Sequence, residues 1–262
     1  MNGVKHAAIR AYYHTLFSAW GHQHWWPAGS RFEVIVGAYL TQNTSWTNVE
    51  KALANLKTAG RLTLHGIRRL PQLELEQLIR PAGYFRQKTQ RLKTFVNFLD
   101  HRYGGSLTRM FSRPTEELRD ELLALNGVGP ETADSILLYA GNRPVFVVDT
   151  YTMRILERHG IVSGANTYED IQRLFEDALE RKKASTTELA SSSSERRTVN
   201  SGIGSQDSSH RPSRMSRAER TPLAQVFNEM HGLIVKVGKT YCLKTQPRCE
   251  HCPLQKFLPQ TL

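Results

Sequence analysis

Cysteine is scarce in this chain of 262 residues, because its three cysteines, Cys242, Cys249 and Cys252, all lie in one short stretch. An odd number packed so closely is a poor disulfide framework and indicates metal or cluster ligation. Long apolar runs are missing too, and without about eighteen consecutive apolar residues no membrane span is predicted. The first ten residues lack the apolar core of a signal peptide, so we expect a cytoplasmic protein.

Strand patterns are almost absent. Only residues 145–148 resemble a strand, and four residues cannot support a sheet. Apolar residues instead recur at three- and four-residue spacing, with Gly and Pro between the periodic segments. We therefore predict an all-α protein, with helices over residues 5–19, 31–41, 46–58, 73–79, 87–102, 115–125, 131–140, 150–159, 167–182 and 222–238.

The chain is strongly basic. Its formal net charge is +11 and its pI is about 9.8, which favours a polyanionic partner. Residues 181–220 contain nine basic and four acidic residues, so five of these charges lie in a segment that we do not expect to fold. The remaining charge of +6 points less strongly to nucleic acid than the total does.

Residues 184–217 differ from the rest in composition. They contain eleven serines and few large apolar side chains, so they cannot bury enough surface to offset the entropy of ordering. We predict a flexible insertion between two helices. It is either a tolerated loop or a basic tether that adds nonspecific DNA affinity.

A tight turn joins two predicted helices at Gly127-Val128-Gly129. The two glycines allow a sharp reversal, and Val128 can plug the turn into the core. Backbone N–H groups at the start of the second helix would then face outward, where a DNA phosphate can bind without any base being read. The longer pattern from Leu125 to Ala133, with Thr132 near the turn, makes this more specific than a bare Gly-x-Gly.

A lone carboxylate follows the turn by about twenty residues. Asp149 comes after Val147-Val148 and before a predicted helix. Aspartate is a preferred helix N-cap, so a purely structural role is the simplest interpretation of this residue by itself. Its position after the hairpin makes a catalytic role the competing hypothesis.

The hairpin followed by Val-Val-Asp-Thr resembles the helix-hairpin-helix DNA glycosylase superfamily that includes endonuclease III. The resemblance implies that Asp149 stabilises the cationic sugar formed as the base leaves, or activates water against it. Bifunctional members carry a Schiff-base lysine two residues after the second glycine, where this chain has Glu131. We therefore expect a monofunctional enzyme, although a lysine from another part of the chain stays an open alternative.

Tryptophans form the next dense signal. A single Trp is most simply a core residue, but the neighbours Trp25 and Trp26 cannot easily both face one core. A glycosylase flips its target base and holds it between flat side chains, and indole rings also attract a cationic alkylated base. A cationic base is in addition a better leaving group.

The combined pattern is similar to the type III 3-methyladenine DNA glycosylase branch of this superfamily. That resemblance implies that Trp25, Trp26, Glu131 and Lys239 lie at the base pocket, that Trp46 wedges into the duplex, and that Gln42 contacts the gap left by the flipped base. The hairpin itself predicts phosphate contacts from the backbone at Gly127, Val128, Gly129 and Thr132. The matching segments are Trp25-Trp26-Pro27, Phe32-Glu33, Gly37 to Thr44, Pro81 to Lys88, Gly127 to Asp134, Val147 to Asp149 and His231-Gly232.

Two further assignments have structural alternatives. Lys239 could equally be a solvated surface charge. The basic residues after Pro81-Ala82-Gly83 either contact phosphates or form a solvated helix face; they are Arg86, Lys88, Arg91 and Lys93.

The cysteine spacing reproduces the first three positions of the [4Fe-4S] loop of the superfamily. The fourth ligand would fall on Leu258, and clusters of this type take four thiolates. His251 and His231 are conceivable substitutes. Either a three-cysteine cluster or a degenerate loop without a cluster fits the sequence, and we expect no cofactor to be required for the chemistry.

We predict a two-lobed helical glycosylase fold. The first lobe is a six-helix barrel over residues 31–145 that contains the hairpin, and the second combines residues 1–30 with 146–262, including the cysteine loop at 242–252. The expected function is base excision repair, in which a monomer hydrolyses the N-glycosidic bond of a damaged purine such as 3-methyladenine in double-stranded DNA. The alternatives are an endonuclease III-like enzyme for oxidised or mismatched pyrimidines and a non-catalytic DNA-binding module.

Overall fold

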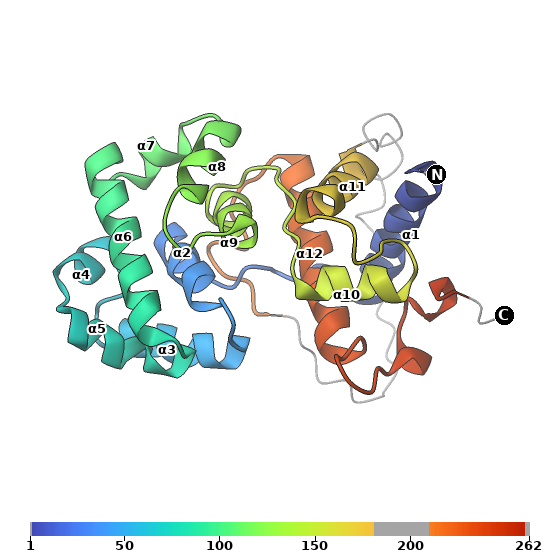
Figure 1. Cartoon of the computed structure of the whole chain (residues 1–262), viewed down its shortest axis with the longest axis horizontal. Helices are drawn as coiled ribbons and strands as arrows, with labels where there is room; N and C mark the ends of the chain where they lie inside the picture. The colour runs from blue at the N-terminus through green and yellow to red at the C-terminus, as the bar shows by residue number, and fades with distance from the viewer. Residues whose placement is uncertain (1, 181–209, 260–262) are drawn as a thin grey trace. The chain divides into compact units, whose positions relative to one another are not determined.

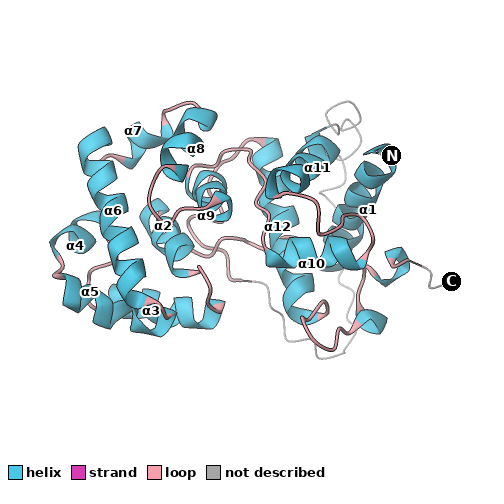
Figure 2. Ribbon diagram, viewed as in Figure 1, coloured by secondary structure: helices cyan, strands magenta, loops and turns pink. Residues whose placement is uncertain are grey.

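The structure, a computed structural model, describes residues 2–180 and 210–259. All regular structure within these two ranges is helical, and neither range contains a strand (Figure 2). The prediction of an all-α protein is therefore confirmed. None of the described helices combines the length and the apolar content that crossing a membrane requires.

Twelve α-helices occur in the described residues, and the ten predicted helices all overlap one of them (Figure 1). Two further helices, α4 and α7, escaped prediction because each has fewer than two turns and so shows no periodicity. The bounds are α1 (Asn2–Trp20), α2 (Arg31–Leu40), α3 (Trp46–Thr58), α4 (Leu64–Arg69), α5 (Gln72–Ile79), α6 (Phe85–Tyr103), α7 (Leu107–Phe111), α8 (Thr115–Leu123), α9 (Pro130–Ser135), α10 (Thr150–Arg158), α11 (Tyr168–Glu180) and α12 (Pro222–Thr240).

The short helices depend on their caps. The Thr63 hydroxyl accepts a hydrogen bond from the Gly66 amide at 2.9 Å, and the Ser106 hydroxyl accepts one from Arg109 at 3.3 Å. Such caps satisfy N–H groups that have no partner within the helix. Beyond α9 the chain continues as a π-helical segment, Ile136–Ala140, within the range 131–140 that was predicted as one helix.

Contacts divide the chain into two units. The hairpin unit comprises residues 26–147 and 212–228, and the terminal unit comprises the described residues before 26, from 148 to 211, and from 229 onward. This division differs from the expected lobes at three places, because residues 26–30, 146–147 and 212–228 group with the hairpin unit. A backbone contact joins the first and the last of these: the Met215 amide donates to Ala28 O at 3.0 Å.

The core of the hairpin unit surrounds α2, in which Phe32 to Leu40 are all buried. This helix packs against α3, α6, α9 and the π-helical segment. Its N-cap is Ser30, whose hydroxyl accepts a hydrogen bond from the Glu33 amide at 3.1 Å. A helix that is apolar on nearly every side belongs in a core, so the rest of the unit is built around it.

Two lysines proposed as phosphate contacts serve the fold instead. The Lys88 ammonium is buried and donates to Leu40 O at 2.9 Å and Ala82 O at 2.7 Å, and burial followed by the charge of Arg91 lowers its pKa to about 8. Lys93 donates to the carbonyls of Ile67 and Leu70 at the end of α4. The phosphate assignment was wrong for both, because their long side chains turn inward to carbonyls that lack helical partners.

In the terminal unit, α1 packs along α11 (Figure 1). The helices α10 and α12 approach closely at Gly238, where an added Cβ would lie 2.2 Å from the Tyr151 ring. Glu229 on α12 anchors the segment after α1, because its carboxylate accepts from the Gln23 amide and lies 3.0 Å from His22 Nδ1. The segment that ends in Trp25 is therefore fastened to α12.

The serine-rich range 184–217 divides at the edge of the described residues. Residues 184–209 lie outside them. Residues 212–217 are packed in the hairpin unit, where Met215 is buried and the Ser213 hydroxyl accepts a hydrogen bond from the Ala28 amide at 3.2 Å. The prediction of a flexible insertion was wrong for this last part, because one apolar anchor and one hydroxyl tie it down.

Candidate active site and nucleic-acid interface

Asp149 occupies the N-cap of α10 in the terminal unit. Its Oδ1 accepts two hydrogen bonds from Thr152, one from the amide at 2.8 Å and one from the hydroxyl at 2.9 Å. The other oxygen, Oδ2, lies 3.5 Å from Nε2 of His231 on α12. The capping role considered from the sequence is therefore present, but it uses one oxygen only and leaves Oδ2 facing an imidazole.

The surroundings of Asp149 hold it in its charged form. Burial of this carboxyl, which is 8% exposed, would by itself raise its pKa. The neighbouring His231 and the hydrogen bonds from Thr152 outweigh that effect and keep the pKa below its ordinary value. The carboxylate thus stays negative at neutral pH in a site largely shielded from water.

Trp25 and Lys239 lie in the same part of the terminal unit. The Trp25 ring centroid is 6.4 Å from that of His231, and the Lys239 ammonium lies 5.9 Å from the Trp25 centroid. Gly232 permits this approach, since a Cβ there would meet Trp25 Cβ at 3.0 Å. The structure therefore brings together the predicted residues Asp149, Trp25 and Lys239, with His231 between the carboxylate and the indole.

For His231, unlike the other residues of this group, we predicted no role in base release from the sequence. It lay within a matching segment, but its approach to Asp149 depends on how α10 and α12 pack. The one local signal was Gly232, because a glycine inside a helix often marks a close contact with a neighbouring element.

In the hairpin unit, the turn at residues 127–129 has the backbone conformation that its first glycine predicts. Gly127 has φ +78°, and an added Cβ would lie 2.0 Å from Arg91 Nε. Val128 is buried, so the turn is plugged into the core. Gly129 is the N-cap of α9 with φ −98°, and a Cβ there would meet nothing within 4 Å. The first glycine is required by the fold, whereas the second leaves open space beside the backbone.

Gln42 supports this hairpin directly. Its side-chain amide donates to Gly127 O and to the Thr132 hydroxyl, both at 2.9 Å, and its carbonyl accepts a hydrogen bond from Arg91. The Thr132 hydroxyl accepts this hydrogen bond from Gln42, which ties the start of α9 to the turn. The hydrogen bonds of Arg91 and Gln42 together hold the turn in one conformation.

Trp26 and Trp46 meet in the hairpin unit. The ring of Trp26 lies 5.1 Å from that of Trp46, nearly edge to face, and 5.1 Å from that of Tyr139. Trp46 is half-buried. Trp25 and Trp26 thus pack within different units, which answers the question that their adjacency raised.

Two residues of the hairpin unit have side chains that are open to solvent. Glu131 stands in the first turn of α9 with an exposed side chain. Tyr84, to which the sequence gave no role, is 66% exposed and has φ +44°. An aromatic ring held out to solvent is suited to stacking on a base. Its signal in the sequence was weak, since exposure of one tyrosine follows no periodic pattern.

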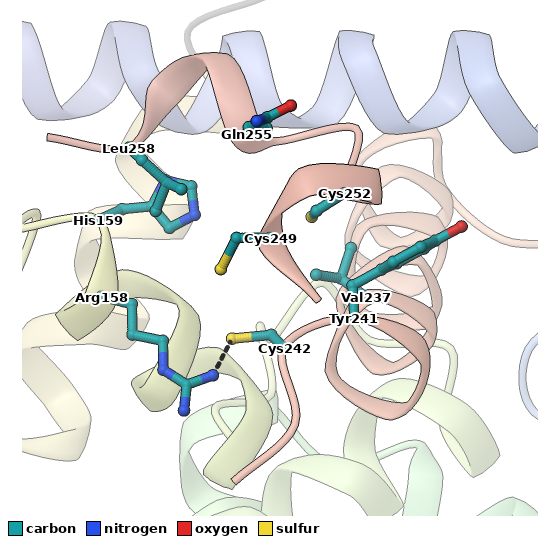
Figure 3. Close-up of a pocket in the computed structure, with 9 residues that line it drawn as sticks. All are labelled: Arg158, His159, Val237, Tyr241, Cys242, Cys249, Cys252, Gln255 and Leu258. Atoms are coloured by element: carbon teal, nitrogen blue, oxygen red, sulfur yellow. Dashed lines mark hydrogen bonds between the residues drawn. The ribbon is translucent and has the colours of Figure 1, made fainter. Parts of the chain in front are cut away.

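The three cysteines line one cavity of the terminal unit (Figure 3). Burial raises the pKa of the Cys252 thiol, and a backbone hydrogen bond at Leu254 opposes this to a smaller extent. The neighbouring Cys242 and Cys249 add to the increase. The cavity has a volume of about 20 Å³, and its lining residues are Arg158, His159, Val237, Tyr241, Cys242, Cys249, Cys252, Gln255 and Leu258.

Comparison with known proteins shows the family of the chain. Residues 36–181 match the HhH-GPD superfamily of base excision DNA repair proteins, so more than half of the chain carries the family pattern. A candidate DNA repair glycosylase of Methanocaldococcus jannaschii is 37% identical over 98% of both chains. The chain therefore belongs to the HhH-GPD superfamily of DNA glycosylases, as its motifs indicated.

More particular relatives point in two directions. Endonuclease III of Thermotoga maritima is 32% identical over 56% of this chain and 67% of its own length. Among solved structures, the 3-methyladenine DNA glycosylase of H. pylori, bound to 1,N6-ethenoadenine, superposes with a TM-score of 0.68 and 28% identity over 90% of this chain and 97% of that chain. An endonuclease III in a covalent complex with DNA has a TM-score of 0.69 at 20% identity, which shows the shared fold.

Proposed function

We propose that this DNA glycosylase is monofunctional and hydrolyses the N-glycosidic bond of an alkylated purine such as 3-methyladenine. The observation that carries the proposal is the group formed by Asp149, His231 and Trp25 in the terminal unit. It combines a buried anion, one oxygen of which is fixed by Thr152, with an aromatic ring nearby.

The chemistry follows from the fixed charge. As the bond between C1′ and the base breaks, positive charge develops on the sugar, and a preorganised carboxylate in a dry site stabilises it. Water then attacks C1′ and its proton passes to Asp149 Oδ2, which is the oxygen not taken by Thr152. His231 acts as a positioning residue, because its Nε2 lies 3.5 Å from that oxygen and favours the charged carboxylate.

Recognition of the base would rest on the aromatic rings. A cationic alkylated purine stacks favourably on an indole and leaves as a neutral base, so strong protonation of the leaving group is unnecessary. Trp25 is the indole that accompanies Asp149, and Lys239 stands beside it. For Trp26 the base-contacting role rests on the resemblance alone. For Trp46, packed against Trp26, a supporting role fits better than the wedge expected from the sequence.

Binding of double-stranded DNA would use the backbone of the hairpin. Gln42 and Arg91 hold residues 127–129 in one conformation, so the amides at the start of α9 are fixed before a phosphate arrives. We propose that Gln42 supports this turn in addition to any contact with the gap in the duplex, and that the protein acts as a monomer.

The absence of strand cleavage is proposed from Glu131. A carboxylate cannot form a Schiff base with C1′, and Glu131 occupies the hairpin position at which bifunctional relatives have lysine. Lys239 is the amine beside Trp25, and its proposed role is electrostatic. The similarity to the H. pylori 3-methyladenine glycosylase supports the purine substrate, whereas the similarity to endonuclease III keeps a pyrimidine lesion as the rival.

A panel of duplexes tests this function. We expect release of 3-methyladenine, with strand scission only after alkali treatment, and no release from thymine glycol or G·T duplexes. Release from the pyrimidine substrates alone would favour the rival specificity. Scission without alkali, together with covalent trapping of the protein by borohydride, would overturn the monofunctional mechanism.

A further inference from the structure

One face of α12 receives the chain that follows α1. Residues three and four apart lie on the same side of a helix, and this spacing joins Glu229, Gly232, Lys236 and Lys239. Each of these four residues contacts the segment at residues 20–25. This face of α12 is therefore the surface on which the segment lies.

Glu229 holds the backbone of the segment. Its buried carboxylate accepts a hydrogen bond through Oε2 from the Gln23 amide at 3.0 Å. Its Oε1 lies 3.0 Å from His22 Nδ1, but the His22 side chain is 62% exposed, so water weakens this second contact. A buried hydrogen bond to a charged group stabilises more than a neutral one. The bond to the Gln23 amide is therefore the one that fixes the segment.

Gln23 connects this anchor to the end of α1. Its side-chain amide donates to Trp20 O at 3.3 Å and to Gly21 O at 2.9 Å, which are carbonyls beyond the reach of the helical hydrogen bonds. Its Cβ also lies close to α12, since a Cβ added at Gly232 would meet it at 3.1 Å. Gln23 is thus fixed by both helices at once.

His24 turns the chain between this anchor and the indole. Its φ is +52°, a left-handed conformation that a residue other than glycine keeps only where its neighbours hold it. Those neighbours are Gln23, which is bound to Glu229, and Trp25, which lies against α12. Loss of the bond to Gln23 would let His24 relax, and the turn would then carry Trp25 away from α12.

We propose that Glu229 is a positioning residue for base release. By holding the Gln23 amide, its carboxylate keeps Trp25 on α12, where the indole centroid lies 6.4 Å from that of His231 and His231 faces Asp149. The inference rests on the proposed function, in which Trp25 stacks on the flipped base. Glu229 acts through this indole, so its removal should cost only what the indole contributes.

A double-variant cycle on single-turnover release of 3-methyladenine tests this role. Trp25→Ala should lower the rate by about 10-fold, and Glu229→Ala should lower it by about 5- to 10-fold. The double variant should match Trp25→Ala within about twofold, because residues that act through one another are not additive. Independent damage to the fold would instead multiply the two losses.

Glu33 of the hairpin unit provides the matched control. It is buried too, its Oε2 accepts a hydrogen bond from the Gly29 amide at 3.0 Å, and its Oε1 lies 3.1 Å from Lys57 Nζ. It therefore anchors a loop in the same way, but a loop without Trp25. Any loss of rate in Glu33→Ala should multiply with that of Trp25→Ala. Coupling as strong as that of Glu229 would overturn the specific role of Glu229.

Two further substitutions separate position from charge. Glu229→Gln keeps an oxygen within reach of the Gln23 amide and should keep the rate within about threefold of wild type. Glu229→Asp keeps the charge but is one methylene shorter, so it should lose about as much as Glu229→Ala. If Glu229→Ala does not fold by urea denaturation, the cycle uses Glu229→Asp. A normal rate in Glu229→Asp beside a slow Glu229→Gln would overturn the proposal.

The same cycle separates this inference from the function on which it rests. An unchanged rate in Trp25→Ala would overturn the role of the indole and the role of Glu229 with it. A slow Trp25→Ala beside a normal Glu229→Ala, or losses that multiply in the double variant, would overturn the role of Glu229 alone.

Discussion

The hairpin at residues 125–132 and the Asp149 site both stand at the start of a helix, but they are stabilised in different ways. The hairpin depends on its backbone conformation and on the hydrogen bonds of the Gln42 side chain, and its glycines make it recognisable in the sequence. The Asp149 site depends on a pairing with His231 that only the packing of α10 and α12 creates. A site made by backbone can be recognised locally, whereas a site made by side chains from distant segments cannot.

The largest difference between the two regions should appear on adding a methyl group to the hairpin. Gly127→Ala places a Cβ at positive φ and within 2.0 Å of Arg91 Nε. We expect a loss of roughly 2 kcal/mol or more in the free energy of unfolding, because left-handed backbone strain alone costs about 1–2 kcal/mol. Affinity for undamaged duplex should fall by about 10-fold or more.

Gly129→Ala is the matched control, since its Cβ would meet no atom within 4 Å. Urea denaturation and fluorescence anisotropy measure the two quantities. Equal losses of stability in both variants would contradict the distinction drawn between the two glycines.

Removal of the indole should affect the Asp149 site and spare the hairpin. Trp25→Ala is expected to lower base release by about 10-fold, since stacking of a base on an aromatic ring contributes about 1–3 kcal/mol. Binding of undamaged DNA should stay within about twofold. Single-turnover release of 3-methyladenine is the measurement, and Trp25→Phe should recover most of the rate. An unchanged rate in Trp25→Ala would remove this ring from the site.

The pairing of Asp149 with His231 predicts a pH effect. Burial raises the pKa of Asp149, whereas His231 and Thr152 together bring it below the ordinary value. In His231→Gln the burial effect meets less opposition, so the pKa should rise and the acid limb of base release should move to higher pH. Rates across a pH series give the limb, and a profile that does not move would contradict the proposed positioning role.

Lys239 should have the smallest effect. Its ammonium lies 5.9 Å from the Trp25 centroid, and a long-range charge on a partly solvated helix contributes little. Lys239→Met is expected to change base release by less than about fivefold. A complete loss, together with loss of any borohydride-trapped product, would instead identify Lys239 as a Schiff-base amine.

Much of the fold was predictable because helical periodicity survives without tertiary information. The ten predicted helices all appear, whereas α4 and α7 are too short to show a pattern by themselves and depend on the caps Thr63 and Ser106. The inward course of Lys88 was unpredictable for another reason. In the sequence, a lysine among other basic residues predicts a solvated helix face. Only the structure shows that the carbonyls of Leu40 and Ala82 accept hydrogen bonds from the Lys88 ammonium.

The candidate site shows the same limit. Asp149, Trp25 and the hairpin glycines could be singled out from the sequence, because the hairpin, the aspartate that follows it and the paired indoles together resemble a known superfamily. The contacts of His231 with Asp149 and of Gln42 with Gly127 join segments far apart in the chain. No local pattern encodes such pairs, so the structure had to supply them.

Asp149→Asn tests the central claim most directly. Asparagine caps a helix about as well as aspartate, so stability should change little while the negative charge is lost. Single-turnover release of 3-methyladenine should fall by about 100-fold or more, with duplex affinity within about twofold of wild type. Release within about tenfold of the wild-type rate, by a folded variant that binds DNA normally, would contradict the assignment of Asp149 as the catalytic carboxylate.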